Sequence, residues 1–553
     1  MKALIKIFLI FFIIFSLSSI SGIITTTNVA SKNNISESWT SMVNSTRMMS
    51  DITILASDTY GGRYPGTEGS DWTIEYIEDE FSRLNLSKIS NRDDYKQPFI
   101  LNDWVKPITP INLTINGHLL VYGEDFTEFM YTGNSSVTSS TEIVFAGYSI
   151  KATNYNDYNS IDASGKIVLA VRGIPSGVSS YHGYFGSKAR AAYEEGAIGF
   201  ILVNHPDYGT DAPIKGTLTS SNFLSDMGSV SINRTSLSET GLPIETWIDE
   251  LDNAIYPLPY TGSKSFNSGY NATMTVTTEY RPQVTTYNVL GKLDATAPIS
   301  TRTIFLTAHH DHLGTSPAGD VYNGADDDAS GVAVVLESAR VLSEIYKSND
   351  TLYSTTVIFA LWSAEEMGLL GSTYFVDHPL IPLNSIDLVL QHDMVGVGPI
   401  NGFLTIDGGL DISSSAKTMI SNAATTYGNV NGLNPETSSG RSDHAPFLDH
   451  GIDAVNFVWS TYDNHPYYHT PLDTTDRIVP EVLSKVARTS IGIVYDYGVY
   501  VSGTTTTPSS HTTTVEFTTT TDPNASKNAK GFTLLLVIGV LPIIVLLKGN
   551  RKD

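Results

Sequence analysis

Histidine, aspartate and glutamate side chains follow the predicted strands of this sequence, or lie in loops that adjoin those strands. The groups are, in chain order, His309 to His312, Asp326 to Asp328, Glu365 with Glu366, His392 with Asp393, and His465 with His469. Imidazoles and carboxylates are donors that zinc accepts in proteins, and one carboxylate can be shared by two ions. Another carboxylate beside such a pair would serve as a general base that takes a proton from water. The groups therefore predict a hydrolytic centre with two zinc ions.

Each group by itself has an ordinary explanation. An isolated His-x-Asp is usually a surface or capping pair, and three aspartates before a helix suit a helix cap. Glu365 and Glu366 would also suit the positive end of a helix dipole. Five such groups, all at strand ends or in adjoining loops, are much harder to explain by chance. Their coincidence favours a metal site.

Residues 281–500 alternate between predicted strands and predicted helices. Strands are predicted at residues 303–307, 356–362, 386–391 and 454–458, and helices at residues 331–346, 416–427 and 480–495. This alternation predicts an α/β domain with a mostly parallel sheet flanked by helices. In such folds ligands bind beyond the carboxyl ends of the strands, which is where the polar groups are placed.

Two regions precede this catalytic core. Residues 38–130 open with helical patterns at 39–56 and 72–84, and are predicted to be the amino-terminal part of the same domain. Residues 131–270 contain short strand-like runs between Gly-, Asp- and Ser-rich loops, which predicts an inserted β-rich domain. Its strands are predicted at residues 142–146, 166–171 and 199–203, and a helix is predicted at residues 187–195.

Six segments of the catalytic core resemble peptidase family M28, which contains zinc aminopeptidases and related carboxypeptidases. The segments are, in the order of the family, Ala308–Gly314, Gly324–Gly331, Trp362–Ser372, His392–Gly396, Gly440–Phe447 and Tyr468–Thr474. The loop Gly62–Thr67 looks like the amino-terminal loop of the family. The inserted region resembles the protease-associated (PA) domain through Phe145–Tyr148, Gly165–Val168 and Gly196–Gly199. The resemblance covers about residues 40–500.

The resemblance implies a set of metal ligands. His309 and Asp393 would bind one zinc ion. Glu366 and His469 would bind the other, and Asp327 would bridge the two. Asp327 is preferred among three consecutive aspartates because of its spacing to the Ala-Ser-Gly sequence that follows.

The resemblance also implies roles for residues around the ions. Glu365 would be the general base, and Tyr468 would hydrogen-bond the tetrahedral intermediate. The Asp311 carboxylate would orient a ligand imidazole, and Arg441 resembles a residue that contacts substrate in some members. The family often has Asn where this chain has Asp328, and the extra carboxylate would change the local field.

The resemblance implies a zinc-dependent exopeptidase, and the frequency of aminopeptidases in the family favours one that hydrolyses amino-terminal residues from extracellular peptides. Three alternatives stay open: a carboxypeptidase of the same fold (glutamate carboxypeptidase-like), a glutaminyl cyclase-like transferase, and a receptor-like ectodomain without catalysis. The sequence contains neither Gly-x-Ser-x-Gly nor His-Glu-x-x-His. Their absence disfavours a serine hydrolase and a zinc protease with both histidines on one helix.

Net charge, the lack of cysteine and the sequences of the two chain ends limit the class of protein. The chain has 33 basic against 57 acidic residues, a net charge of −24, which disfavours nucleic-acid binding. It contains no cysteine, so disulfides and thiolate metal sites are excluded. Residues 1–22 resemble a signal peptide, residues 503–528 a Thr-, Ser- and Pro-rich stalk, and residues 531–547 a transmembrane helix followed by basic residues. With several Asn-x-Ser/Thr sites, these features predict an exported, membrane-anchored glycoprotein whose catalytic body lies outside the cell.

Overall fold

The computed structural model describes residues 39–498, except residues 91, 130–131, 176, 209–210, 215–223, 225, 255–263, 299, 301, 349–351 and 461–464. These residues belong to one compact unit, which ends at Ser502. The predicted signal peptide (1–22), stalk (503–528) and transmembrane helix (531–547) lie outside the described residues. Among the helices that are described, none is long and apolar enough to cross a bilayer.

The catalytic region is built on a mixed sheet whose central strands are parallel. The strand order is β15-β14-β16-β13-β11-β12-β10, where β10 spans Ser265–Leu293. The four strands β12, β11, β13 and β16 run parallel to one another, whereas β10 and β14 on either side are antiparallel to them. The strands are β11 (Arg302–His309), β12 (Thr355–Trp362), β13 (Leu388–His392), β14 (Leu404–Asp407), β15 (Leu433–Pro435) and β16 (Ala454–Trp459). The predicted α/β fold with a mostly parallel sheet is confirmed, and four of these strands coincide closely with the predicted ones.

The pairing register brings the carboxyl ends of these strands level with one another. His309 at the end of β11 pairs with Trp362 at the end of β12. Thr307 of β11 pairs with Gln391 of β13, which pairs in turn with Asn456 of β16. Residues that follow β11, β12 and β13 therefore emerge at one edge of the sheet.

Alternate residues of the central strands fill two hydrophobic cores on opposite faces of the sheet. Leu306 and Leu390 belong to the larger core, whereas their neighbours Phe305 and Val389 belong to the smaller one. The larger core is covered by α2 (Ser45–Leu55), α3 (Glu68–Arg83), α7 (Gly331–Lys347), α9 (Ser414–Ala423) and α11 (Pro480–Gly498), and the smaller one by α8 (Leu370–Asp377) and α10 (Ala445–Asp449). Burial on both faces explains why the central strands are apolar almost throughout.

Helix α7 is mostly buried, and two of its charged residues, Glu337 and Arg340, are paired with the amino-terminal helices. The Arg340 guanidinium lies 2.6 Å from the carboxylates of Asp51 in α2 and Glu80 in α3. Glu337, which is fully buried, accepts a hydrogen bond of 2.6 Å from Arg47. Removing one partner of a buried ion pair costs about 3–5 kcal/mol, so these contacts hold α2 and α3 firmly against α7.

The inserted region contains a sheet with its own hydrophobic clusters. In the order β4-β7-β8-β9-β3, the first four strands are parallel and β3 is antiparallel to β9. The elements are β3 (Phe126–Glu128), β4 (Ser135–Ala146), β7 (Ile167–Val171), α4 (Phe185–Glu194), β8 (Gly199–Val203), β9 (Gly228–Ile232), α5 (Arg234–Glu239) and α6 (Ile244–Ala254), with a small hairpin of β5 (Lys151–Ala152) and β6 (Tyr155–Asn156). The three predicted strands and the predicted helix are all present.

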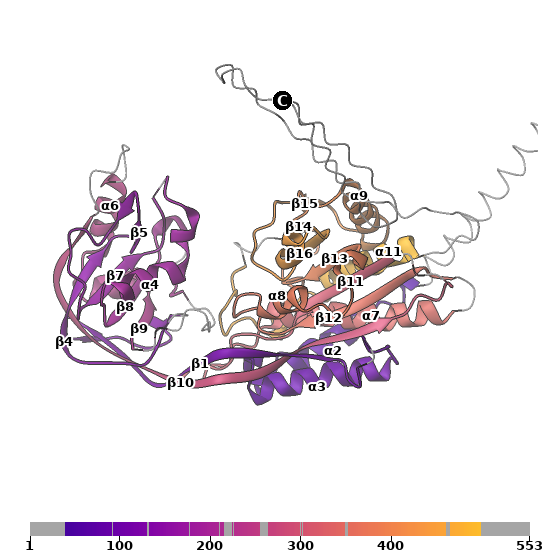
Figure 1. Cartoon of the computed structure of the whole chain (residues 1–553), viewed down its shortest axis with the longest axis horizontal. Coiled ribbons are helices and arrows are strands. Elements are labelled where there is room, and N and C mark those ends of the chain that lie inside the picture. The colour runs from indigo at the N-terminus through magenta and orange to yellow at the C-terminus, as the bar shows by residue number, and fades with distance from the viewer. Residues whose placement is uncertain are drawn as a thin grey trace, which may run out of the picture. The chain divides into compact units, whose positions relative to one another are not determined.

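Two long strands, β1 (Lys96–Ile115) and β10 (Ser265–Leu293), have no counterpart in the sequence prediction. They run side by side and antiparallel over most of the length of β1 (Figure 1). Strand β10 pairs with β4 of the inserted region and with β12 of the catalytic sheet, so one strand belongs to both. Pro98, Pro107 and Pro110 interrupt the β-like pattern of β1, because proline cannot donate to a strand ladder. A short strand, β2 (His118–Leu119), pairs with the end of β1.

Candidate metal centre

The predicted metal ligands all come from segments at the carboxyl edge of the catalytic sheet. They are His309, the last residue of β11; Asp327, in the irregular turn of residues 325–330 before α7; Glu366, in the loop after β12; Asp393, directly after β13; and His469, between β16 and α11. The peptide bond after Asp327 is cis. Segments far apart in the chain thus meet because their strands are neighbours in the sheet.

Three of these side chains form a first candidate site. His309 Nε2 lies 3.2 Å from Asp327 Oδ1 and 3.7 Å from Asp393 Oδ1. All three residues are buried, and one potential ligand atom from each lies within 4.8 Å of the others. Ligands bonded to a tetrahedral zinc ion at about 2.1 Å lie about 3.4 Å apart. The observed separations therefore suit ligands arranged around one shared ion.

A second candidate site uses the other oxygen of Asp327. His469 Nε2 lies 3.2 Å from Asp327 Oδ2 and 3.1 Å from Glu366 Oε2. Because Oδ1 of Asp327 faces His309 while Oδ2 faces His469, this carboxylate has the geometry of a bridge between two ions. His312 also lies at this site, with Nδ1 2.7 Å from Glu366 Oε1, although no sequence pattern pointed to a role for it.

The two adjacent glutamates lie in the same buried cluster but differ in protonation. Burial raises the pKa of Glu365 well above its usual range, against the attraction of the His309 ring. Burial would also raise the pKa of Glu366, but the neighbouring His469 and His312 lower it to about 2. Glu366 therefore stays ionised, as a metal ligand must be, while Glu365 keeps a proton to higher pH than an ordinary glutamate does. Glu365 Oε2 lies 4.0 Å from His309 Nε2, at the margin of the cluster.

Tyr468 and Arg441 border the second site. The Tyr468 ring stacks on the His469 ring, with centroids 3.8 Å apart. Burial, together with the charges of Asp327 and Glu366, raises the pKa of Tyr468 well above its usual value, so its hydroxyl stays protonated and can donate a hydrogen bond. The Arg441 guanidinium lies 5.9 Å from the centre of the Tyr468 ring. The predicted substrate contact thus lies at the same edge as the predicted ligands.

Asp311 makes contacts that differ from the expected ones. The ring nitrogen Nδ1 of His309 lies 3.2 Å from the backbone carbonyl of Asp311 and 3.8 Å from its carboxylate. The carboxylate instead accepts hydrogen bonds from the backbone amides of Glu365, at 3.1 Å, and Glu366, at 3.4 Å. The imidazole is therefore oriented by the Asp311 carbonyl, while its carboxylate holds the segment that carries the two glutamates.

A buried arginine from the loop Gly62–Thr67 holds two of the ligand-bearing loops. Its guanidinium donates to the backbone carbonyls of His310 at 3.0 Å, Asn323 at 2.6 Å and Gly324 at 2.9 Å. This residue, Arg63, is only 1% exposed. The sequence indicated the loop by family resemblance, but gave no sign that its arginine would reach the catalytic core.

Two further carboxylates fix the turn that carries Asp327. Asp473 accepts hydrogen bonds from the backbone amides of Asp326 and Asp327, each at a distance between 2.9 and 3.1 Å. Asp328 accepts from the amides of His309, at 3.1 Å, and Gly331, at 2.9 Å. Asp328 therefore joins the end of β11 to the start of α7, and Asp327 is the aspartate of this run that occurs in both candidate groups.

The donors at this edge fit zinc. They are imidazole nitrogens and carboxylate oxygens, the donors of catalytic zinc sites. Both ring nitrogens of His312, and Oε1 of Glu366, are buried without a hydrogen-bond partner. Unpartnered buried polar atoms are rare in folded proteins, and a bound cation would satisfy Glu366 Oε1 and the Nδ1 atom of His312. His309, Asp327 and Asp393 would hold one ion, and Glu366 and His469 would share Asp327 to hold a second.

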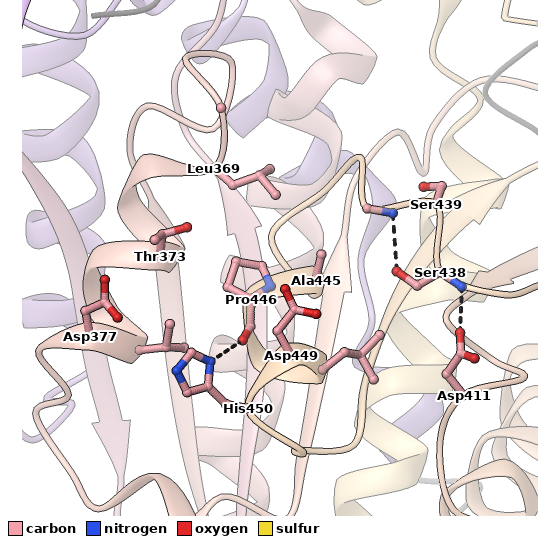
Figure 2. Close-up of a pocket in the computed structure, with 14 residues that line it drawn as sticks. Leu369, Thr373, Asp377, Asp411, Ser438, Ser439, Ala445, Pro446, Asp449 and His450 are labelled. Atoms are coloured by element: carbon pink, nitrogen blue, oxygen red, sulfur yellow. Dashed lines mark hydrogen bonds between the residues drawn. The ribbon is translucent and has the colours of Figure 1, made fainter. Parts of the chain in front are cut away.

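A separate pocket of about 610 Å³ adjoins the loops that follow Glu366 and precede Arg441. Its wall includes Leu369 and Thr373 on one side and Ser438 and Ser439 on the other (Figure 2). The carboxylates of Asp377, Asp411 and Asp449 also line it. None of the predicted metal ligands does, so this pocket is not the metal centre itself.

Two family models match the chain. The model of peptidase family M28 matches residues 288–494, and the model of the PA domain matches residues 138–239. The chain is similar to Aminopeptidase YwaD from Bacillus subtilis (strain 168), with 34% identity over 197 residues, or 35% of this chain and 40% of the relative. It is also similar to a Glutamate carboxypeptidase 2 homolog from Caenorhabditis briggsae, with 26% identity over 420 residues, or 62% of this chain and 51% of the relative. The chain thus spans about half the length of the curated relatives it matches.

Solved structures share the fold over most of the described chain. An aminopeptidase from Aneurinibacillus sp. strain AM-1 is 26% identical, with a TM-score of 0.62, over 84% of this chain and 96% of its own. BSAP, a zinc aminopeptidase from Bacillus subtilis, is 24% identical, with a TM-score of 0.60, over 82% of this chain and 96% of its own. At that identity the second comparison speaks for the fold alone.

The metal-free protein should lose stability as pH rises from about 6.5 toward about 10. Burial lowers the pKa of His469, but Glu366 and Asp327 outweigh it and raise the pKa to about 10. A folded-state pKa above the unfolded value stabilises the protein at low pH, and that contribution is lost as the ring deprotonates. Zinc would replace the proton and remove this loss. Thermal unfolding of chelated and zinc-loaded protein between pH 6 and pH 10 measures both profiles, and parallel profiles would contradict this account.

Proposed function

Because residues 288–494 form a peptidase domain of family M28, preceded by a PA domain, we propose that this chain is a zinc-dependent aminopeptidase. It would bind two ions and hydrolyse amino-terminal residues from peptides. The observation that carries this proposal is the pair of candidate metal sites that share Asp327, with the protonatable Glu365 at their margin.

The residues at this edge have the properties that peptide hydrolysis requires. Zinc bound there would provide Lewis-acid activation of a water molecule and of the scissile carbonyl. Glu365, with its raised pKa, would take a proton from the attacking water and deliver it to the leaving amine. The Tyr468 hydroxyl would donate a hydrogen bond to the oxyanion of the tetrahedral intermediate.

An aminopeptidase is favoured over a carboxypeptidase by the similar proteins, among which are Aminopeptidase YwaD and the aminopeptidase from Aneurinibacillus. The free carboxylate of a peptide would instead suit the Arg441 guanidinium, which borders Tyr468. The similarity to a glutamate carboxypeptidase homolog also supports a carboxypeptidase as the second candidate. Which terminus is recognised is therefore a matter for direct measurement.

The purified chain, loaded with zinc, should trim one test peptide in its free and C-amidated forms but not in its N-acetylated form. N-acetylation removes the free ammonium that an aminopeptidase must recognise, whereas C-amidation leaves it intact. Mass spectrometry of the released residues, with and without chelator, makes the measurement. Loss of trimming on C-amidation alone would move the assignment to a carboxypeptidase. If the zinc-loaded chain cut none of several peptides, a receptor-like role would replace both.

Replacing Glu365 with glutamine should lower kcat by about 10²–10⁴-fold, because the amide cannot transfer the proton. Zinc content, measured by mass spectrometry after dialysis, should not change, since Glu365 lies outside both candidate ligand groups. Glu344→Gln, at an exposed position of α7, is the matched control and should leave both quantities unchanged. Substantial turnover by Glu365→Gln would rule out this glutamate as the general base.

We also propose that the catalytic body is exported and anchored in a membrane by the carboxyl-terminal segment. The support is the sequence of residues 1–22, 503–528 and 531–547 alone. The full chain should sediment with membranes and be digested by protease added outside intact cells. A chain that ends before residue 531 should instead appear in the medium. A full-length chain that stays in the cytosolic fraction would overturn this location.

A further inference from the structure

His312 occupies an unusual environment beside the second candidate site. Its side chain is fully buried, and neither ring nitrogen has a hydrogen-bond partner. A buried imidazole without partners is normally strongly disfavoured. The backbone nevertheless makes room for this ring, because a Cβ atom on Gly324 would lie 2.5 Å from its Cδ2 atom. The ring is thus held in a fitted position with its polar atoms unsatisfied.

One of the two unsatisfied nitrogens, Nδ1, lies next to the predicted ligands. His312 Nδ1 is 2.7 Å from Glu366 Oε1 and 3.8 Å from Asp327 Oδ2. The other oxygen of Glu366 is 3.1 Å from His469 Nε2. The two imidazoles therefore approach the same pair of carboxylates through different oxygens of Glu366.

A hydrogen bond between His312 and Glu366 is the obvious alternative. The distance of 2.7 Å would allow one. The two atoms can form an ion pair when the ring is protonated, but neither has a partner in hydrogen-bond alignment. Two ligand atoms of one cation approach each other in this way, because their lone pairs point at the cation and not at each other.

We propose that His312 is a further protein ligand of the ion held by Glu366, Asp327 and His469. The inference rests on the proposed zinc site but not on the proposed reaction. It makes the two sites unequal, with three protein ligands in the site of His309 and four in the site of His312. Four protein ligands are typical of closed zinc sites, and three leave a position open. The ion beside His312 is therefore the more tightly bound.

X-ray absorption of the zinc-loaded full chain tests this without a variant. Imidazole rings give a distinct scattering signature, so rings bound per zinc can be counted. With His309, His312 and His469 as ligands, three rings are expected for every two ions. Two rings for every two ions would overturn the proposal. The same preparation, assayed on a free peptide, reports the proposed function separately, because a chain with three rings that cuts nothing refutes the reaction but not the ligand.

Zinc affinity of variants provides the second measurement. His312→Asn, which keeps a polar side chain but lacks the imidazole, should weaken one of two zinc equivalents by more than about 100-fold, beyond the effect typical of an outer-sphere partner. Competition with a zinc-binding dye makes the measurement, and circular dichroism of the metal-free variants checks folding. His450→Asn, at an exposed position away from the site, should bind like the parent chain. Unchanged affinity in a folded His312→Asn would show that His312 binds no metal.

Discussion

The concentration of buried negative charge at one edge of the catalytic sheet is the constraint on which the rest of the site depends. Carboxylates cannot all be ionised in a buried cluster unless cations face them. In the metal-free chain part of that compensation comes from imidazoles, which is why the pKa of His469 is raised to about 10. Divalent ions would complete it. The affected carboxylates are Asp327, Asp393, Glu365 and Glu366.

Like charges are kept together by groups that bind the backbone rather than the carboxylates. Arg63 donates to carbonyls of the loops after β11 and before α7, while Asp473 and Asp328 accept from amides of the turn that carries Asp327. Asp311 does the same for the segment after β12. Because these partners are buried, the loops are fixed before any ion binds, and the ligands need little rearrangement to hold one.

Adjacent residues acquire different chemistry from this arrangement. Glu366 faces imidazoles, and its pKa falls to about 2, whereas the pKa of Glu365, one residue earlier and also buried, rises. One side chain is thereby suited to bind a cation and the other to exchange a proton. The same logic separates Asp327, whose two oxygens face two imidazoles, from Asp328, which is taken up by backbone amides.

The sequence by itself determined the α/β class, most of the strands and the residues that meet at the carboxyl edge of the sheet. Buried parallel strands are apolar runs followed by polar loops, and this pattern is local enough to read from residues 303–312 or 386–393. The sequence prediction missed β1 and β10, because prolines interrupt the strand pattern of both. Only the tertiary structure decided that Arg63 reaches the ligand loops, that the Asp311 carboxylate binds backbone amides, and that His312 faces Glu366. Those contacts join residues distant in the chain, and neither spacing nor periodicity specifies which side chain fills a buried position between them.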